Sequence, residues 1–75
     1  MLNNKWQKGF IDGYKYWVLA FEEGSIYGID DGRISKLEIR DSDNNFIALY
    51  DRGWVVMPQD DAHIEVVSNL ISKYN

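Results

Sequence analysis

The sequence predicts an α+β fold in which an antiparallel sheet of about four strands, built from hairpins, carries one C-terminal helix on one face. Three observations support this prediction. Runs rich in aromatic and β-branched residues dominate the chain as far as residue 57. Asp-Gly pairs at 12–13 and 31–32 follow or separate such runs, and this pair is the strongest short-range signal for a hairpin. From Asp60 onward the apolar residues recur at helical spacing instead.

The first hairpin is expected to join strands at 5–11 and 14–22 through Asp12-Gly13. Both faces of the second strand are apolar. One face carries Tyr14, Tyr16, Val18 and Ala20, and the other carries Lys15, Trp17, Leu19 and Phe21. Because a single helix covers only one face, we expect the other face to be closed by the 23–32 segment or by a second copy of the chain.

Glycines at positions 24, 28 and 32 punctuate the next segment, where residues 26–29 can pair as a short strand before the Asp31-Gly32 hairpin. The run "RISKLEIR" (33–40) is predicted to be the third strand. Strict alternation would place Leu37 and Ile39 on one of its faces and Ile34 on the other.

The run "DSDNN" (41–45) has the composition of a turn, because Asp, Ser and Asn side chains bond their own nearby backbone. "FIALYD" (46–51) is predicted to be the fourth strand. We expect "WVVM" (54–57) to continue this strand after a bulge at Gly53.

The final element is predicted to be an amphipathic helix over 60–74, preceded by Pro58 and capped by Asp60. Its expected apolar face comprises Ile64, Val67, Leu70, Ile71 and Tyr74. The composition shows no break, so residues 1–75 are expected to form a single domain. A chain this short buries only roughly 60% of its unfolded surface, and we expect its aromatic residues to be needed for the core.

Composition and charge favour some functional classes over others. The absence of cysteine removes disulfides and thiolate metal sites. The formal charge of −4 comes from 12 acids and 8 bases, and the acids gather at turns and in the C-terminal segment. This balance disfavours binding to a phosphate backbone, so nucleic acid is not the expected partner. No apolar run is long enough to span a membrane, and a cytoplasmic protein is expected.

The sequence does not indicate catalytic chemistry. "DSDNNF" begins like a calcium loop, but Phe46 stands where the loop needs glycine and Arg52 stands at the ligand position twelve. His63 is the only histidine and has no second base or nucleophile next to it. We therefore expect no catalytic residue, no metal and no cofactor, and we expect that the protein is not an enzyme.

The segment "YDRGW" (50–54) and the basic residue that follows Gly32 provide the candidate binding residues, which are Arg33, Tyr50, Asp51, Arg52 and Trp54. A hairpin between the third and fourth strands would bring Arg33 near Asp51 as a supporting cross-strand pair. Arg52 and Trp54 would then contact a partner, because Arg and Trp dominate binding hot spots. The alternative is that Trp54 fills the core beside Trp17.

The residues Tyr27-Gly28-Ile29, the run "GRISKL" (32–37) and "YDRGW" resemble a family of small uncharacterised proteins from Gram-positive bacteria and their phages. The resemblance spans nearly the whole chain. It implies a phage or mobile-element setting and no mechanism.

The expected function is that of a small non-catalytic accessory protein acting by protein–protein binding. Two alternatives remain open. One is a dimeric structural or assembly protein, since a homodimer would cover the second apolar face. The other is an acidic inhibitor that mimics nucleic acid, which would require the acids to lie on one face.

Overall fold

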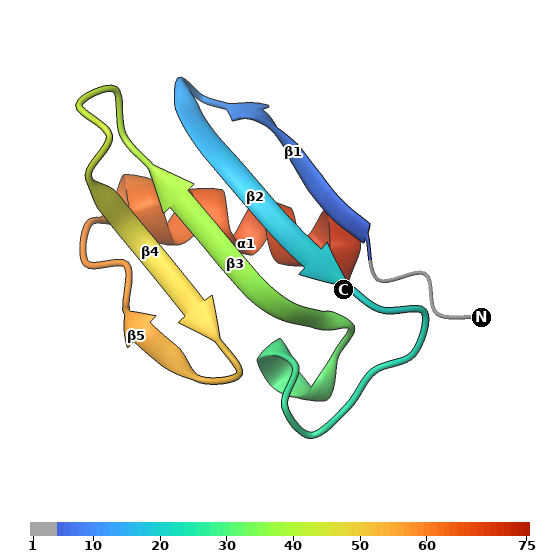
Figure 1. Ribbon diagram of the computed structural model, residues 1–75. Coiled ribbons are helices and arrows are strands. Elements are labelled where there is room, and N and C mark those ends of the chain that lie inside the picture. Colours follow the sequence, from blue (N-terminus) through green and yellow to red (C-terminus); the bar gives the residue numbers. More distant parts are fainter. Residues whose placement is uncertain (1–4) are drawn as a thin grey trace.

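The computed structural model describes residues 5–75 and shows a five-stranded antiparallel sheet with one helix across one face (Figure 1). The strands lie side by side in chain order. They are β1 (Lys5–Ile11), β2 (Tyr14–Ala20), β3 (Ile34–Arg40), β4 (Phe46–Asp51) and β5 (Trp54–Val56), followed by the helix α1 (Asp61–Tyr74). The predicted α+β fold is confirmed, with five strands where about four were expected.

The β1–β2 hairpin forms where the sequence predicted it. Asp12 and Gly13 both adopt positive φ, at 51° and 85°. Two consecutive positive φ values are what a two-residue hairpin turn requires to match the twist of its strands, and Asp-Gly adopts them at low cost.

The predicted hairpin at Asp31-Gly32 is wrong. Residues 21–33 instead form a loop that contains a short 3₁₀ helix, η1 (Ile29–Asp31), and the β2–β3 ladder ends where Phe21 N donates to Arg33 O at 2.9 Å. Gly32 has an ordinary φ of −95°. The local turn signal is overridden because the loop folds back to bury Ile29 in the core, so this segment forms no strand.

A bulge in β3 changes which side chains face the core. Leu19 pairs with Lys36, whereas its neighbour Ala20 pairs with Ile34, so Ser35 is an extra residue in the ladder. The extra residue reverses the alternation and turns Ile34 onto the same side as Leu37, where both are fully buried. The expectation that Ile34 lies on the polar face is therefore wrong.

The segment after β4 reverses direction instead of continuing. Asp51 N donates to Gly53 O at 2.9 Å, and Arg52 adopts a φ of 56°. This tight turn sets Trp54 opposite Tyr50 as the start of β5. Gly53 thus belongs to a turn between two antiparallel strands and not to a bulge within one.

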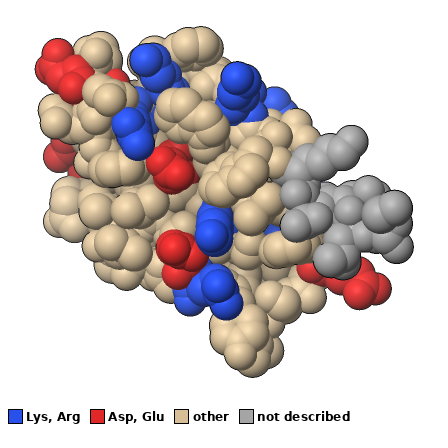
Figure 2. Space-filling view, in the orientation of Figure 1, with Lys and Arg blue, Asp and Glu red and all other residues tan. Residues whose placement is uncertain are grey.

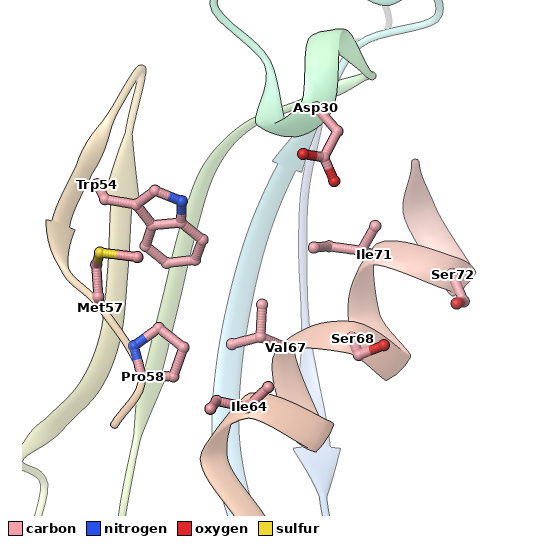
Figure 3. Close-up of a pocket in the computed structure, with 9 residues that line it drawn as sticks. All are labelled: Asp30, Trp54, Met57, Pro58, Ile64, Val67, Ser68, Ile71 and Ser72. Carbon is pink, nitrogen blue, oxygen red and sulfur yellow. The ribbon is translucent and has the colours of Figure 1, made fainter. Parts of the chain in front are cut away.

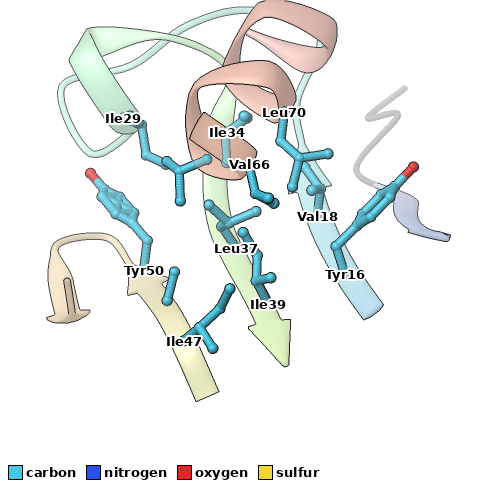
Figure 4. Close-up of a cluster of buried hydrophobic side chains, with 12 residues drawn as sticks. Tyr16, Val18, Ile29, Ile34, Leu37, Ile39, Ile47, Tyr50, Val66 and Leu70 are labelled. Carbon is cyan, nitrogen blue, oxygen red and sulfur yellow. The ribbon is translucent and has the colours of Figure 1, made fainter. Parts of the chain in front are cut away.

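The core lies between the sheet and α1 (Figure 4). Val66, Val67 and Leu70 of the helix are buried against the strands, which confirms that α1 packs on one face. The core side chains contributed by the sheet and the loop are mostly aliphatic, with Tyr16 and Tyr50 as the aromatic members. We call this side of the sheet the helix face and the opposite side the open face.

The 23–32 segment does not close the open face as expected, because Ser25 and Tyr27 border that face only near Leu19. That segment contributes Ile29 to the core on the helix face. On the open face Trp6 and Phe10 remain 47% and 74% exposed. Among the described residues, no helix has the length and apolar character needed to cross a membrane.

Candidate functional site

The candidate residues of the sequence do not form one site. Arg33 Nη2 donates to Tyr74 O at 2.9 Å, at the C-terminal end of α1. Asp51 lies opposite Lys36 in the ladder, with 3.9 Å between Lys36 Nζ and Asp51 Oδ1. The predicted pair between Arg33 and Asp51 is therefore wrong, because Asp51 registers with Lys36 and Arg33 lies beyond the end of β3. The Lys36–Asp51 pair is well exposed and contributes little to stability.

Tyr50 has a structural role. It is buried, and its hydroxyl donates to Tyr27 O at 2.9 Å, which anchors the 21–33 loop to β4. Burial raises the pKa of Tyr50, and the nearby carboxylates of Asp30 and Asp31 raise it further. Its ring also supports Trp54 in an edge-on contact, with 5.2 Å between ring centroids.

Trp54 lines a groove between the β5 segment and the helix, which we call the β5–α1 groove (Figure 3). Its volume is about 440 Å³. Its apolar lining consists of Trp54, Met57, Pro58, Ile64, Val67 and Ile71. Ser68 and Ser72 add hydroxyls from α1, and the Asp30 carboxylate projects toward the groove from η1. Segments far apart in the sequence therefore build this groove together.

Several of the large apolar side chains that line the groove are exposed. Met57 and Ile64 are 55% and 47% exposed, and Trp54 is 37% exposed. Trp17 lies on the open face, since it pairs with Glu38 and alternates with the buried Tyr16 and Val18. The alternative in which Trp54 fills the core beside Trp17 is therefore wrong.

Arg52 and Trp54 are separated by the turn between them. Arg52 borders a different hollow, with Leu19, Ser35 and Lys36 among its lining residues. The two residues therefore line different hollows, and their joint contact with a partner stays a prediction. The groove residues Met57, Pro58 and Asp30 were missed because their proximity depends on β5 and η1, which the sequence did not predict.

The polar turn 41–45 is held by its own side chain. Asp41 Oδ1 accepts hydrogen bonds from the backbone N–H groups of Asp43 and Asn45, both at 2.9 Å. Within residues 5–75, no cluster of three or more His, Cys, Asp or Glu side chains is placed to hold a metal ion. His63 Nδ1 lies 3.8 Å from Asp60 Oδ2, and its ring packs edge-on against Tyr14.

Comparison with known proteins relates the chain to a family. A family described as a domain of unknown function (DUF7678) matches residues 5–75. No curated protein and no solved structure matches the chain.

Proposed function

Because the chain belongs to the DUF7678 family, whose description assigns no function, we propose from its surface that it is a small non-catalytic accessory protein that binds another protein at the β5–α1 groove. The resemblance of its motifs to proteins of Gram-positive bacteria and their phages supports a phage or mobile-element setting. We propose that the protein binds its partner in the bacterial cytoplasm.

The observation that carries the proposal is the exposed apolar lining of the groove. Trp54 stands at one wall and is held by its contact with Tyr50, so a partner would meet a ring that is already oriented. Such pre-ordered aromatic anchors supply much of the binding energy in protein interfaces. The combination of an apolar lining with a few polar groups is that of a site which binds and orients a ligand.

Charge indicates which partner would fit. Asp30 lines the groove, and Asp31 follows it in η1. Asp61 begins the helix on the other side. A partner segment that inserts an apolar side chain and carries Lys or Arg beside it would therefore complement both the lining and the charge. We propose a basic, apolar segment of a protein as the occupant.

The proposal is tested by selecting displayed peptides on the purified protein and measuring their affinity for variants. We expect enrichment of segments that join an apolar residue to Lys or Arg. Met57→Glu and Ile64→Glu should weaken binding at least about tenfold, which corresponds to about 1.4 kcal/mol. Ile26→Glu is the matched control, because Ile26 is an exposed apolar residue in the 21–33 loop, outside the groove.

Two results would overturn the proposal. Selected peptides that bind Met57→Glu as tightly as the wild type would show that the groove is not the binding surface. A wild-type dimer in sedimentation that Met57→Glu converts to a monomer would make the groove a subunit interface, in favour of the structural or assembly alternative. Thermal denaturation of each variant shows whether the fold is retained.

A further inference from the structure

The open face of the sheet gathers basic residues that are scattered in the sequence. Figure 2 looks onto this face, because α1 lies behind the sheet in Figure 1, and it shows Lys and Arg spread over the face around two central acidic patches. The basic residues on the face or at its border are Lys8, Lys15, Lys36, Arg40 and Arg52. The acids among them are Glu38 and Asp51.

Both of these acids are already paired. Glu38 Oε1 lies 3.5 Å from Arg40 Nη2, and Asp51 pairs with Lys36 at 3.9 Å. Among the described residues, the other three cations of the face form no ion pair with an acid; they are Lys8, Lys15 and Arg52. A chain with a formal charge of −4 therefore presents a face with a surplus of positive charge.

Aromatic rings alternate with these cations. The Arg40 guanidinium lies 4.4 Å from the centre of the Phe46 ring and 5.6 Å from that of Trp17. Phe46 is 40% exposed, and Phe10 on β1 is one of the most exposed rings of the described chain. The expectation that the core needs the aromatic residues does not hold for these rings, since they lie on the face opposite α1.

Two hollows on this face each combine two cations with two rings. The first has a volume of about 410 Å³ and is lined by Lys8, Phe10, Lys15 and Trp17, with the Gly9–Tyr16 strand pair between them. The second has a volume of about 420 Å³ and includes Phe21, Tyr27, Lys36 and Arg52, with the hydroxyls of Ser25 and Ser35.

We propose that the open face binds single-stranded nucleic acid, with bases stacked on the exposed rings and phosphates beside the unpaired cations. The repeated pairing of rings with cations supports this ligand, because each nucleotide offers one flat base and one negative charge. A duplex would match the charge, but its bases are stacked inside and cannot reach Phe10 or Trp17. An acidic protein segment would match the cations and leave the rings without a partner.

The direct test is fluorescence anisotropy with labelled oligothymidine, and with a mixed-sequence strand, of about 12 nucleotides, within the site size of sheet-based single-strand binders. Phe10→Ala should weaken binding by about 5- to 150-fold, the range for loss of one stacked base. Phe10 is suited to the test because it is 74% exposed and its loss leaves the core intact. Ile26→Ala, at a comparably exposed apolar residue outside both hollows, should leave the affinity unchanged.

The cations are tested by salt dependence. Replacing Lys8 and Lys15 together by Ala should make the slope of log affinity against log salt shallower by about 1.4, since each phosphate contact on a single strand contributes about 0.7. Lys73→Ala, on α1, is the matched control and should leave the slope unchanged.

Three results would overturn the inference. One is failure of wild-type protein to bind either strand at low salt. Another is equal affinity of the wild type and Phe10→Ala, since charge alone would then explain binding. The third is a dimer that Phe10→Glu dissociates, which would assign the face to a second copy. Met57→Glu should retain oligonucleotide binding, so failure of the groove proposal and failure of this one give different results.

Discussion

At the scale of single residues, the corner at Gly32 is explained by Asn75. The Asn75 side chain accepts a hydrogen bond from Ile34 N at 3.1 Å and donates one to Ile29 O at 2.9 Å. Gly32 lies so close to this amide that a Cβ atom on Gly32 would overlap it. With Arg33 bound to the carbonyl of Tyr74, these contacts fasten the end of α1 to the 21–33 loop. The glycine is needed for close approach and not for a positive φ.

We predict that Asn75→Ala lowers the free energy of unfolding by about 1–3 kcal/mol, because it leaves the buried Ile34 N–H without a partner and removes one of the two hydrogen bonds to Ile29 O, which keeps the one from Gly32 N. Urea denaturation monitored by tryptophan fluorescence measures this loss. Asn69→Ala is the control, since Asn69 is exposed on α1. Equal stability of the two variants would show that the amide contacts do not hold the loop.

At the scale of elements, the sequence predicted those elements that depend only on contacts between residues close together in the chain. The Asp12-Gly13 hairpin needs only two residues that tolerate positive φ, and α1 needs only apolar residues at helical spacing. Nothing in "RISKLEIR" identifies Ser35 as a bulge, because the bulge depends on pairing with β2, where the Ser35 hydroxyl donates to Leu19 O at 3.4 Å. A loop that buries Ile29 likewise depends on the space left by other elements.

The same limit applies to the candidate site. Residue type made Trp54 a candidate contact residue, because tryptophan is enriched at binding hot spots, and Trp54 lines a groove. Which other residues line this groove, and which charged residues share a face of the sheet, depend on how the strands pair. The bulge at Ser35 sets the face of Ile34, and the β3–β4 register sets the partner of Asp51; alternation alone could predict neither.

The attachment of α1 to the sheet gives a prediction at this scale. Leu70 is 1% exposed and lies within the main core. We predict that Leu70→Ala lowers the free energy of unfolding by about 2–5 kcal/mol, the range for truncating a buried leucine. Glu65→Ala, on the exposed side of the helix, is the control. A melting temperature for Leu70→Ala that matches this control would mean that the helix is peripheral to the fold.

At the scale of the whole molecule, tyrosine hydroxyls connect elements that are distant in the chain. Tyr50 joins β4 to the 21–33 loop, and Tyr16 of β2 lies within hydrogen-bond distance of Tyr74 of α1, with 3.1 Å between the two hydroxyl oxygens. Burial is the largest cause of the raised pKa of Tyr74, as it is for Tyr50. The fold therefore favours the neutral form of both side chains.

This preference predicts that the protein loses stability in alkali. An unfolded tyrosine releases its proton near pH 10, whereas the folded pKa of Tyr50 is higher because of burial and the nearby Asp30 and Asp31. Above about pH 10 the unfolded state therefore binds fewer protons than the folded state, and stability falls as the pH rises. Thermal denaturation between about pH 8 and pH 11 should show a smaller fall for Tyr50→Phe than for the wild type, because phenylalanine cannot ionise. Tyr27→Phe is the control, since the Tyr27 side chain is exposed. If Tyr50→Phe and the wild type lost stability equally over this range, Tyr50 would not be the group that couples the fold to pH.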